Sequence, residues 1–425
     1  MSRKQLRAAA ALAAMLVLVA VGVWTWPLGD DQQPPKQPAA TGSDGQPDRG
    51  RRTSEDDRAE RSRRPGGALE LALQDDAVFL HRRHYDRERA FRQATELGVS
   101  RLKVNALWAS TLGEQAGTAA APASPRYRWT PYDRLIEAAR RHGISVELAL
   151  TGPAPAWATG DGRVGPTRPS AARFGEFARA AAEHFRGRID RYSIWNEPNY
   201  ETWLAPQARA PAIYRGLYEA GYRAIKHADP TAKVLFGETA PYAQRGRAIA
   251  PLKFLRAVTC RTASYAPARP CAPLEADGYA HHPYEFSGPP ERPYPGADNV
   301  TIGSLDRVTA ALDRLAAAGA LRTPAGKPLD LYLTEFGYFA IGKRALPDAR
   351  RAEYLTRAFE IAARNPRTRQ MLQYLLVSPP PGTPGGLFDT AVLTTDGRPR
   401  PSFDALAGWA RRETDRGRVV RSGGQ

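Results

Sequence analysis

The stretch that decides the fold reads IDRYSIWNEPNY and runs from Ile189 to Tyr200. Ile189, Tyr192 and Ile194 give its first half the character of a strand, and Trp195 closes the run. Glu197 follows and precedes Pro198, and a residue before proline is driven toward extended backbone. The stretch therefore predicts a strand that ends, and gives way to a loop, at Glu197.

A second stretch has the same design. LDLYLTEFGY, from Leu329 to Tyr338, is an apolar strand that ends in Glu335, and Phe336 follows directly. Two carboxylates thus stand at the ends of two apolar strands, each beside aromatic residues. This surrounding is typical of sites that act on sugars, because one face of a sugar ring is apolar.

Strand-like and helix-like runs alternate eight times between residues 68 and 412. The expected strands are 69–74, 101–108, 144–150, 189–197, 233–239, 274–284, 329–335 and 371–377. Strict alternation of this kind predicts an α/β fold, namely a parallel (β/α)8 TIM barrel. A doubly wound open sheet is the alternative, but no glycine-rich phosphate-binding loop follows any of these strands.

The chain ends differ from this central domain in composition. Three basic residues precede an apolar run from Ala8 to Trp26, so residues 1–26 are expected to be a signal peptide or an uncleaved signal anchor. Residues 27–67 and 413–425 lack the apolar content for a core and are expected to be a disordered linker and a disordered basic tail. Basic residues before the run place the folded domain outside the cell, secreted or membrane-anchored.

The cysteine count and the net charge limit the classes of protein to which the chain can belong. Cys260 and Cys271 are the only cysteines, and in an exported protein such a pair predicts a disulfide, with two free thiols as the alternative. With seven histidines and no C-x-x-C pattern, no metal or other cofactor is expected. The net charge of +17 would suit nucleic-acid binding, but the basic residues do not gather with aromatics on one module. We therefore expect a solvated or membrane-surface charge and no nucleic-acid partner.

Two carboxyls at facing strand ends allow a specific chemistry. Cleaving a glycosidic bond needs one carboxyl as proton donor and a second as nucleophile or base. In a barrel, the ends of the fourth and seventh strands face each other, which predicts that Glu197 and Glu335 meet. Burial and the neighbouring carboxylate would raise the pKa of the donor. Asn196 would be free to bind a sugar hydroxyl beside the scissile bond.

Three motifs make the resemblance to a known group specific. Trp-Asn-Glu-Pro at 195–198, His-Pro-Tyr at 282–284 and Thr-Glu-Phe-Gly at 334–337 resemble the retaining glycoside hydrolases of the large Glu/Glu (β/α)8 clan. Within it, the chain looks closest to the cellulase-like family 5 and β-xylosidase-like family 39 types. The resemblance covers about residues 68–412.

The resemblance implies roles for individual residues. By it, Glu197 is the acid/base, Glu335 is the nucleophile, and Asn196 contacts a sugar hydroxyl. His282 and Tyr284 would hydrogen-bond the nucleophile or the substrate. The implied protein is a monomeric hydrolase of a β-linked poly- or oligosaccharide that needs no cofactor.

Two departures from the clan are visible. An arginine is usual on the second strand, where this chain has Lys103 or Asn105, and a tryptophan is usual at the end of the eighth strand, where residues 378–381 read Ser-Pro-Pro-Pro. Trp108 and Trp157 are the candidate sugar-stacking rings, with core packing as the alternative.

A non-catalytic carbohydrate-binding surface protein on the same barrel is the alternative function, and the two departures are its only support. Glu238 also ends a strand and is therefore a rival carboxylate to the two assigned above. Its expected role, however, is a hydrogen bond to backbone at the rim of the barrel.

Overall fold

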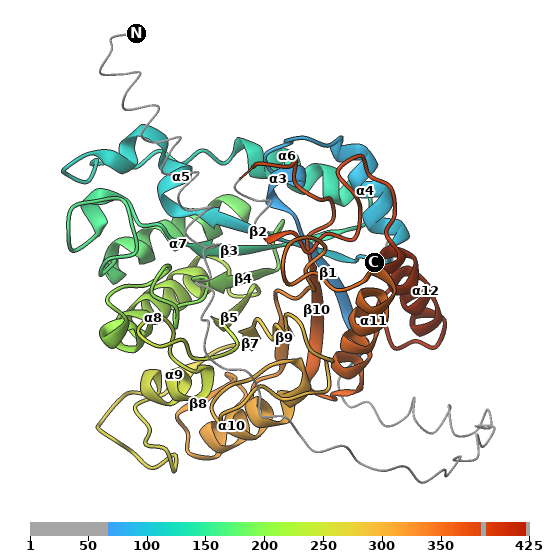
Figure 1. The fold of residues 1–425 in the computed structure, drawn as a ribbon. Helices are drawn as coiled ribbons and strands as arrows, with labels where there is room; N and C mark the ends of the chain where they lie inside the picture. The colour runs from blue at the N-terminus through green and yellow to red at the C-terminus, as the bar shows by residue number, and fades with distance from the viewer. Residues whose placement is uncertain (1–66, 384–387, 422–425) are drawn as a thin grey trace.

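Eight parallel strands close into a barrel in a computed structural model that describes residues 67–383 and 388–421. Around the barrel the order is β1-β10-β9-β7-β5-β4-β3-β2 (Figure 1). The strands are β1 (Glu70–Gln74), β2 (Arg101–Leu107), β3 (Ser145–Thr151), β4 (Arg191–Ile194), β5 (Lys233–Thr239), β7 (Gly278–His281), β9 (Leu331–Leu333) and β10 (Thr368–Tyr374). Closure confirms the predicted (β/α)8 barrel and excludes the open sheet.

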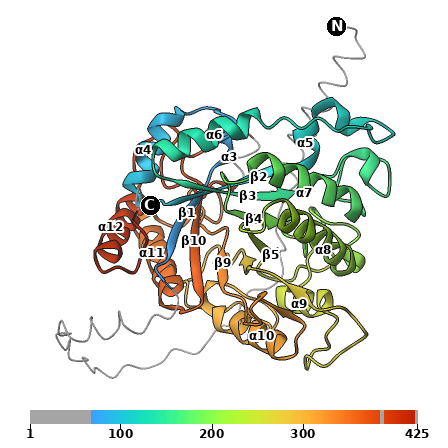
Figure 2. The ribbon, with the colours of Figure 1, turned by 180° about the vertical axis from the view of Figure 1, so that it is seen from behind.

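A long helix follows each barrel strand and packs outside it, so that the helices form an outer ring (Figure 2). They are α4 (Arg87–Glu96), α6 (Thr130–Arg141), α7 (Ala171–Phe185), α8 (Ala210–Ala228), α9 (Pro251–Val258), α10 (Leu305–Ala317), α11 (Asp348–Arg364) and α12 (Pro401–Asp415). Smaller elements are α3 (Asp76–Phe79), α5 (Trp108–Leu112), η1 (Gly113–Gly117), η2 (Ala156–Ala158), η3 (Gln207–Arg209), η4 (Ile302–Ser304), β6 (Leu274–Glu275) and β8 (Leu321–Arg322).

Helix α7 illustrates how the sequence sets these elements. Ser170 precedes it, and the Ser170 hydroxyl accepts a hydrogen bond from the Arg173 N–H, which satisfies one of the free donors at a helix start. Phe174 and Phe177 lie one turn apart and are both fully buried, so the helix presents an apolar stripe to the barrel.

The barrel interior carries buried charge as well as apolar residues. Arg191 lies 2.6 Å from Glu70 and 3.6 Å from Glu147, and its guanidinium stacks over Tyr332. A buried charge without a partner costs several kcal/mol, so these side chains stabilise one another as a set. Lys103 on β2, also fully buried, extends this polar axis toward the C-terminal ends of the strands.

The C-terminal segment is ordered further than the sequence predicts. Helix α12 continues to Asp415, and the buried Glu413 forms an ion pair with Arg418. The Leu69 N–H donates to the Arg418 carbonyl at 2.8 Å, and the Val420 N–H donates to the Leu69 carbonyl at 2.9 Å. The prediction of a disordered tail from residue 413 is therefore wrong through residue 421.

The predicted signal or anchor segment and almost all of the predicted linker, residues 1–66, lie outside the described residues. Within residues 67–383 and 388–421, no helix has the length and apolar character needed to cross a bilayer.

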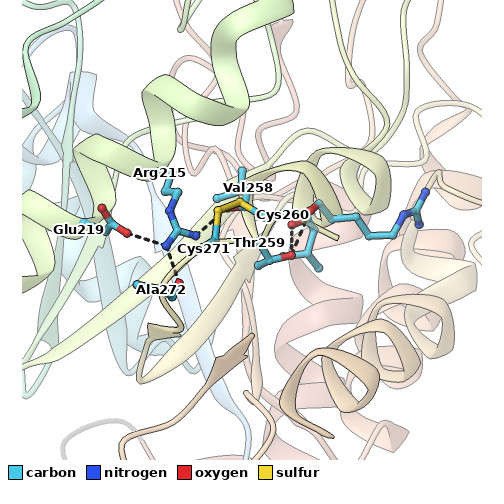
Figure 3. Close-up of a disulfide and its surroundings, with 9 residues drawn as sticks. Arg215, Glu219, Val258, Thr259, Cys260, Cys271 and Ala272 are labelled. Atoms are coloured by element: carbon cyan, nitrogen blue, oxygen red, sulfur yellow. Dashed lines mark hydrogen bonds and ion pairs between the residues drawn. A yellow bond between two sulfur atoms is a disulfide. The ribbon is translucent and has the colours of Figure 1, made fainter. Parts of the chain in front are cut away.

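Cys260 and Cys271 form the predicted disulfide, with their Cα atoms 6.2 Å apart (Figure 3). The Arg215 guanidinium on α8 bonds the carbonyls of Val258 and Ala272, which flank the bridge on either side. The bridged loop comes after α9 and before β7. It therefore lies toward the N-terminal end of the barrel strands, whereas the predicted catalytic residues follow their C-terminal ends.

Candidate active site

The predicted carboxylates stand just beyond the C-terminal ends of two strands. Strand β4 ends at Ile194, so Glu197 lies in the loop three residues later and not on the strand as predicted. Strand β9 ends at Leu333, two residues before Glu335. His282 follows the last residue of β7 directly. In a (β/α)8 barrel this is the end that carries the active site.

One imidazole ring joins the two glutamates. His282 Nδ1 lies 3.1 Å from Glu197 Oε1 and 3.6 Å from Glu335 Oε2. The Tyr284 hydroxyl donates to the same Glu335 oxygen at 3.2 Å. Both carboxylates therefore lie close to the same nitrogen atom, although they come from different strand ends. The structure thus brings four of the predicted site residues together.

Lys103 and Glu238 complete the charged cluster. Lys103 Nζ lies 2.7 Å from Glu238 Oε2 and 3.4 Å from Glu335 Oε1. Glu238 Oε2 is also 3.4 Å from His282 Nε2. The expectation that the Glu238 side chain bonds rim backbone is therefore wrong, since this carboxylate lies between two basic side chains. The backbone carbonyl of Glu238, by contrast, accepts a hydrogen bond from the Glu197 N–H at 2.9 Å.

Burial and neighbouring charges shift the pKa values of the residues in this cluster in different directions. Burial raises the pKa of Glu197; the His282 hydrogen bond opposes that rise, and the charge of Glu335 adds to it. Burial alone would lower the pKa of His282, but Glu335, Glu197 and Glu238 together raise it to about 9. For Glu238, the charge of Lys103 and the contact with His282 outweigh burial and lower the pKa. At neutral pH the cluster therefore holds an imidazolium at His282 and an ammonium at Lys103, beside a Glu197 whose pKa is raised.

The backbone at these strand ends is strained. Trp195, Glu197 and Glu238 have φ angles of 70°, 37° and 50°, in the left-handed region that costs non-glycine residues about 1–3 kcal/mol each. Surrounding bonds hold the conformation. The Trp195 N–H donates to the Leu150 carbonyl at 2.8 Å, and its indole N–H donates to the Trp203 carbonyl at 3.0 Å.

Two further acceptors lie buried at this end of the barrel. Asn196 is almost fully buried, and its Oδ1 atom has no hydrogen-bond partner among the described residues. Asp76, just past β1, accepts from the Asn105 N–H at 3.3 Å through Oδ2, while its Oδ1 is also unpartnered within the described ranges. Burial raises the pKa of Asp76 to about 7. In the sequence, Asp76 is marked only by its place after a strand, a feature that it shares with other carboxylates.

The two tryptophans predicted to stack on sugar lie together in an aromatic cluster. Trp108 is fully buried, and its ring stacks on Phe177 of α7 with centroids 5.7 Å apart. Trp157 meets the edge of Trp108 at 5.9 Å and donates its indole N–H to the Gln115 carbonyl. Trp108 has no free face for a sugar, so its prediction is wrong, and Trp157 belongs to the same packing cluster.

A separate aromatic cluster connects the site to the surface. Tyr284 stacks on Phe286 with ring centroids 4.8 Å apart, and the edge of Tyr242 meets Phe286 at 6.5 Å. Tyr242 in turn stacks on Tyr294 at 4.2 Å with the rings 8° from parallel. Tyr294 is 37% exposed. An unbroken series of rings therefore runs from the Glu335 hydrogen bond to a partly exposed tyrosine.

The eighth barrel strand also ends in an aromatic residue. Strand β10 ends at Tyr374, three residues before the predicted end. Tyr374 is packed edge-on against Phe388, and burial followed by the charge of Glu335 raises its pKa. No tryptophan stands there, as the sequence indicated, but a tyrosine ring occupies the end of this strand.

Among known proteins, similarity to this chain is found only in solved structures. No family model matches the sequence, and no curated protein matches it. A family 39 glycoside hydrolase from the gut symbiont Bacteroides cellulosilyticus is 20% identical, with a TM-score of 0.60 over 81% of this chain and 64% of that one. The chain thus spans less than two thirds of that protein.

Two other solved structures have the same kind of similarity. A monomeric β-xylosidase from Caulobacter crescentus is 19% identical, with a TM-score of 0.52 over 81% of this chain and 69% of that one. Xylanase 10B from Thermotoga maritima is 17% identical, with a TM-score of 0.53 over 82% and 96% of the two chains. At such identities the comparisons show a shared fold, the (β/α)8 barrel of these glycoside hydrolases.

Proposed function

We propose that this protein is a retaining glycoside hydrolase, with Glu335 as nucleophile and Glu197 as acid/base. The observation that carries the proposal is the contact of both carboxylates with His282 Nδ1. Two carboxyls at this spacing, at the C-terminal end of a barrel with the fold of known glycoside hydrolases, fit a double-displacement mechanism.

The mechanism has two steps. Glu335 attacks the anomeric carbon, and the glycosidic C–O bond breaks as Glu197 gives its proton to the leaving oxygen. Glu197, now a carboxylate, then takes a proton from water, which attacks the anomeric carbon and releases Glu335 from the ester. The raised pKa of Glu197 suits the first step, because the acid must hold its proton until the leaving group needs it.

Neighbouring side chains support these steps. Lys103 and the Tyr284 hydroxyl each contact one oxygen of Glu335, so they orient the nucleophile and stabilise its charge when it departs. The unpartnered Asn196 Oδ1 is an acceptor for a sugar hydroxyl. A buried acceptor of this kind can pair with a hydroxyl of a bound sugar, which favours binding of a polyhydroxylated ring.

The test is covalent labelling of the full-length protein with a panel of aryl 2-deoxy-2-fluoro-β-glycosides, including the xyloside and the glucoside. We expect one sugar to become attached to Glu335, as read by peptide mass spectrometry. Product formed with inverted anomeric configuration in an NMR time course, or attachment to another residue, would contradict the proposal.

The two departures from the clan were the only support for the non-catalytic alternative, and this chain has a replacement residue for each of them. Where the clan has an arginine, Lys103 supplies a cation to Glu335. Where it has a tryptophan, Tyr374 supplies a ring at the strand end. We therefore propose a catalytic protein, exported and acting outside the cell as a monomer. Its basic and apolar N-terminus and its disulfide support that location.

We propose that the substrate is a β-linked oligo- or polysaccharide that extends past the cleaved bond. The neighbouring structures include a β-xylosidase and a xylanase, which favours β-linked sugars. The ring series that ends at Tyr294 offers a flat apolar face on which a further sugar unit can stack. Burial, with smaller charge effects that include Glu197, the proposed acid/base, raises the pKa of Tyr242, a ring of this series.

Replacing Tyr294 with alanine is expected to lower kcat/KM on a β-1,4-linked oligosaccharide about fivefold relative to kcat/KM on the matching aryl glycoside, because one stacking contact is worth about 1 kcal/mol. The measurement is the ratio of the two values for each variant. Tyr265→Ala is the matched control, since this tyrosine lies in the disulfide loop away from the site. Equal ratios in both variants would show that Tyr294 does not contact substrate.

A further inference from the structure

Glu238 performs no bond-breaking step in the proposed mechanism, yet it is central to the buried cluster. Its side chain is fully buried, and one carboxylate oxygen contacts both Lys103 Nζ at 2.7 Å and His282 Nε2 at 3.4 Å. Strand β5, which carries it, lies beside β4 and β7 in the barrel. Glu238 is therefore placed between the strand ends that carry Glu197 and His282.

Glu238 lies between two buried basic side chains. The side chains of Lys103 and His282 are both fully buried, and both contact the same Glu238 oxygen. A buried cation without a partner is strongly destabilising, so an anion is needed at this point. Glu238 supplies it to both side chains at once.

We propose that Glu238 is a positioning residue that keeps His282 an imidazolium and Lys103 fixed, so that each catalytic glutamate keeps a hydrogen-bond donor through both steps of the reaction. This inference rests on the proposed function. The contact between His282 Nε2 and Glu238 stabilises a proton on that nitrogen, and Nδ1 can then carry the second proton toward Glu197 and Glu335.

The reaction explains why a fixed ring cation is useful. In the first step, Glu335 loses its negative charge to the ester while Glu197 gains one by giving up its proton. Negative charge therefore moves from one side of His282 Nδ1 to the other, over contacts of 3.6 and 3.1 Å. A neutral ring with an unprotonated Nδ1 would have no proton to donate to whichever glutamate is negatively charged, and its lone pair would repel that carboxylate.

The backbone of Glu238 links the same groups. Its carbonyl accepts from the Glu197 N–H at 2.9 Å, so one residue holds Glu197 through its main chain and His282 through its side chain. Gly237, just before it, has a φ of 119°, and a Cβ atom there would lie 2.4 Å from the Ala280 carbonyl. The approach of β5 to β7 thus requires glycine and fixes the position of Glu238.

The titratable groups that face His282 come from four strand ends: Lys103 on β2, Glu197 after β4, Glu238 on β5 and Glu335 after β9. His281, the neighbour on β7, stays neutral because burial lowers its pKa to about 3, and its ring contacts Thr239 and the Val300 carbonyl. Tyr284 meets the His282 ring edge-on. Of these groups, the Glu238 side chain contacts the His282 nitrogen that points away from both catalytic glutamates.

The experiment is a histidine titration of the Glu238→Gln variant of the full chain by nitrogen-15 NMR, with the His282 signal assigned by its loss in His282→Gln. We expect the pKa of His282 to move from about 9 toward the ordinary value of about 6.5. We expect kcat to fall about 10- to 100-fold, the usual effect of removing a group that orients a functional side chain.

Two variants keep the test decisive. Glu238→Asp retains the charge and should keep the His282 pKa closer to 9 than glutamine does, which also serves if the glutamine variant does not fold. Glu285→Gln removes another buried glutamate at this end of the barrel, which accepts from the Gly288 N–H and does not contact His282, and it should leave the His282 titration unchanged. A His282 pKa that is unchanged in both Glu238 variants would overturn the inference. The titration needs no substrate, so this outcome is distinct from a failure to hydrolyse any glycoside.

Discussion

Replacing Glu335 with glutamine is expected to lower kcat by at least about 10⁴-fold on every substrate, because no other group can form the glycosyl ester. Glutamine keeps the size of the side chain, and its one amide oxygen can still accept from either Lys103 or the Tyr284 hydroxyl, which contact different oxygens of Glu335. We therefore expect the variant to fold and to bind oligosaccharide with little change. The measurement is steady-state kinetics on an aryl glycoside, with binding followed separately by calorimetry.

Glu285→Gln is the matched control for this loss. Glu285 is also a nearly fully buried glutamate at the same end of the barrel, but it accepts a hydrogen bond from the Gly288 N–H at 2.8 Å and contacts neither catalytic carboxylate. Its variant should keep kcat within a few-fold of the unmodified protein. A Glu335→Gln protein that retained a tenth of the original kcat would exclude Glu335 as the nucleophile.

Replacing Glu197 with glutamine is expected to separate the two steps of the reaction. Turnover of substrates with poor leaving groups should fall about 10²- to 10⁴-fold, the usual contribution of a general acid. Dinitrophenyl glycosides need no protonation, so their first step should survive and the glycosyl-enzyme should accumulate. Added azide should then restore turnover and yield a glycosyl azide of retained configuration.

The pH profile gives an independent reading of the same residue. Because Glu197 must be protonated in the first step, kcat/KM is expected to fall as the pH rises through its pKa. Burial raises that pKa above the ordinary value of 4.5, so this alkaline limb lies above pH 4.5 and should vanish in Glu197→Gln when dinitrophenyl glycosides are used. A limb that persists unchanged in the variant would assign it to another group.

The sequence was sufficient for the barrel because each strand–helix pair is marked locally. The alternation of apolar strands with amphipathic helices such as α7, begun by Ser170, needs no knowledge of distant contacts. The two catalytic candidates followed for the same reason, since Glu197 and Glu335 each stand within a few residues of a strand end. Strand order in a closed barrel then places them together.

The remaining features depend on contacts between distant residues. Glu238 meets Lys103 and His282 from two other strands, and no local pattern distinguishes it from a rim carboxylate. Trp108 follows a strand as a sugar platform would, but Phe177, 69 residues later, covers its ring. The ordered C-terminus depends on pairing between Val420 and Leu69, which composition alone could not reveal.

That pairing has a practical consequence. Leu69 precedes the first residue of β1, so both ends of the described chain leave the barrel side by side, at the end opposite the carboxylates. The protein can therefore be immobilised on a resin, or fused to a reporter, through either end while the substrate-facing end stays open to solution. The same proximity allows residues 67 and 421 to be joined by a short linker, so that a circular permutant can begin at a surface loop elsewhere.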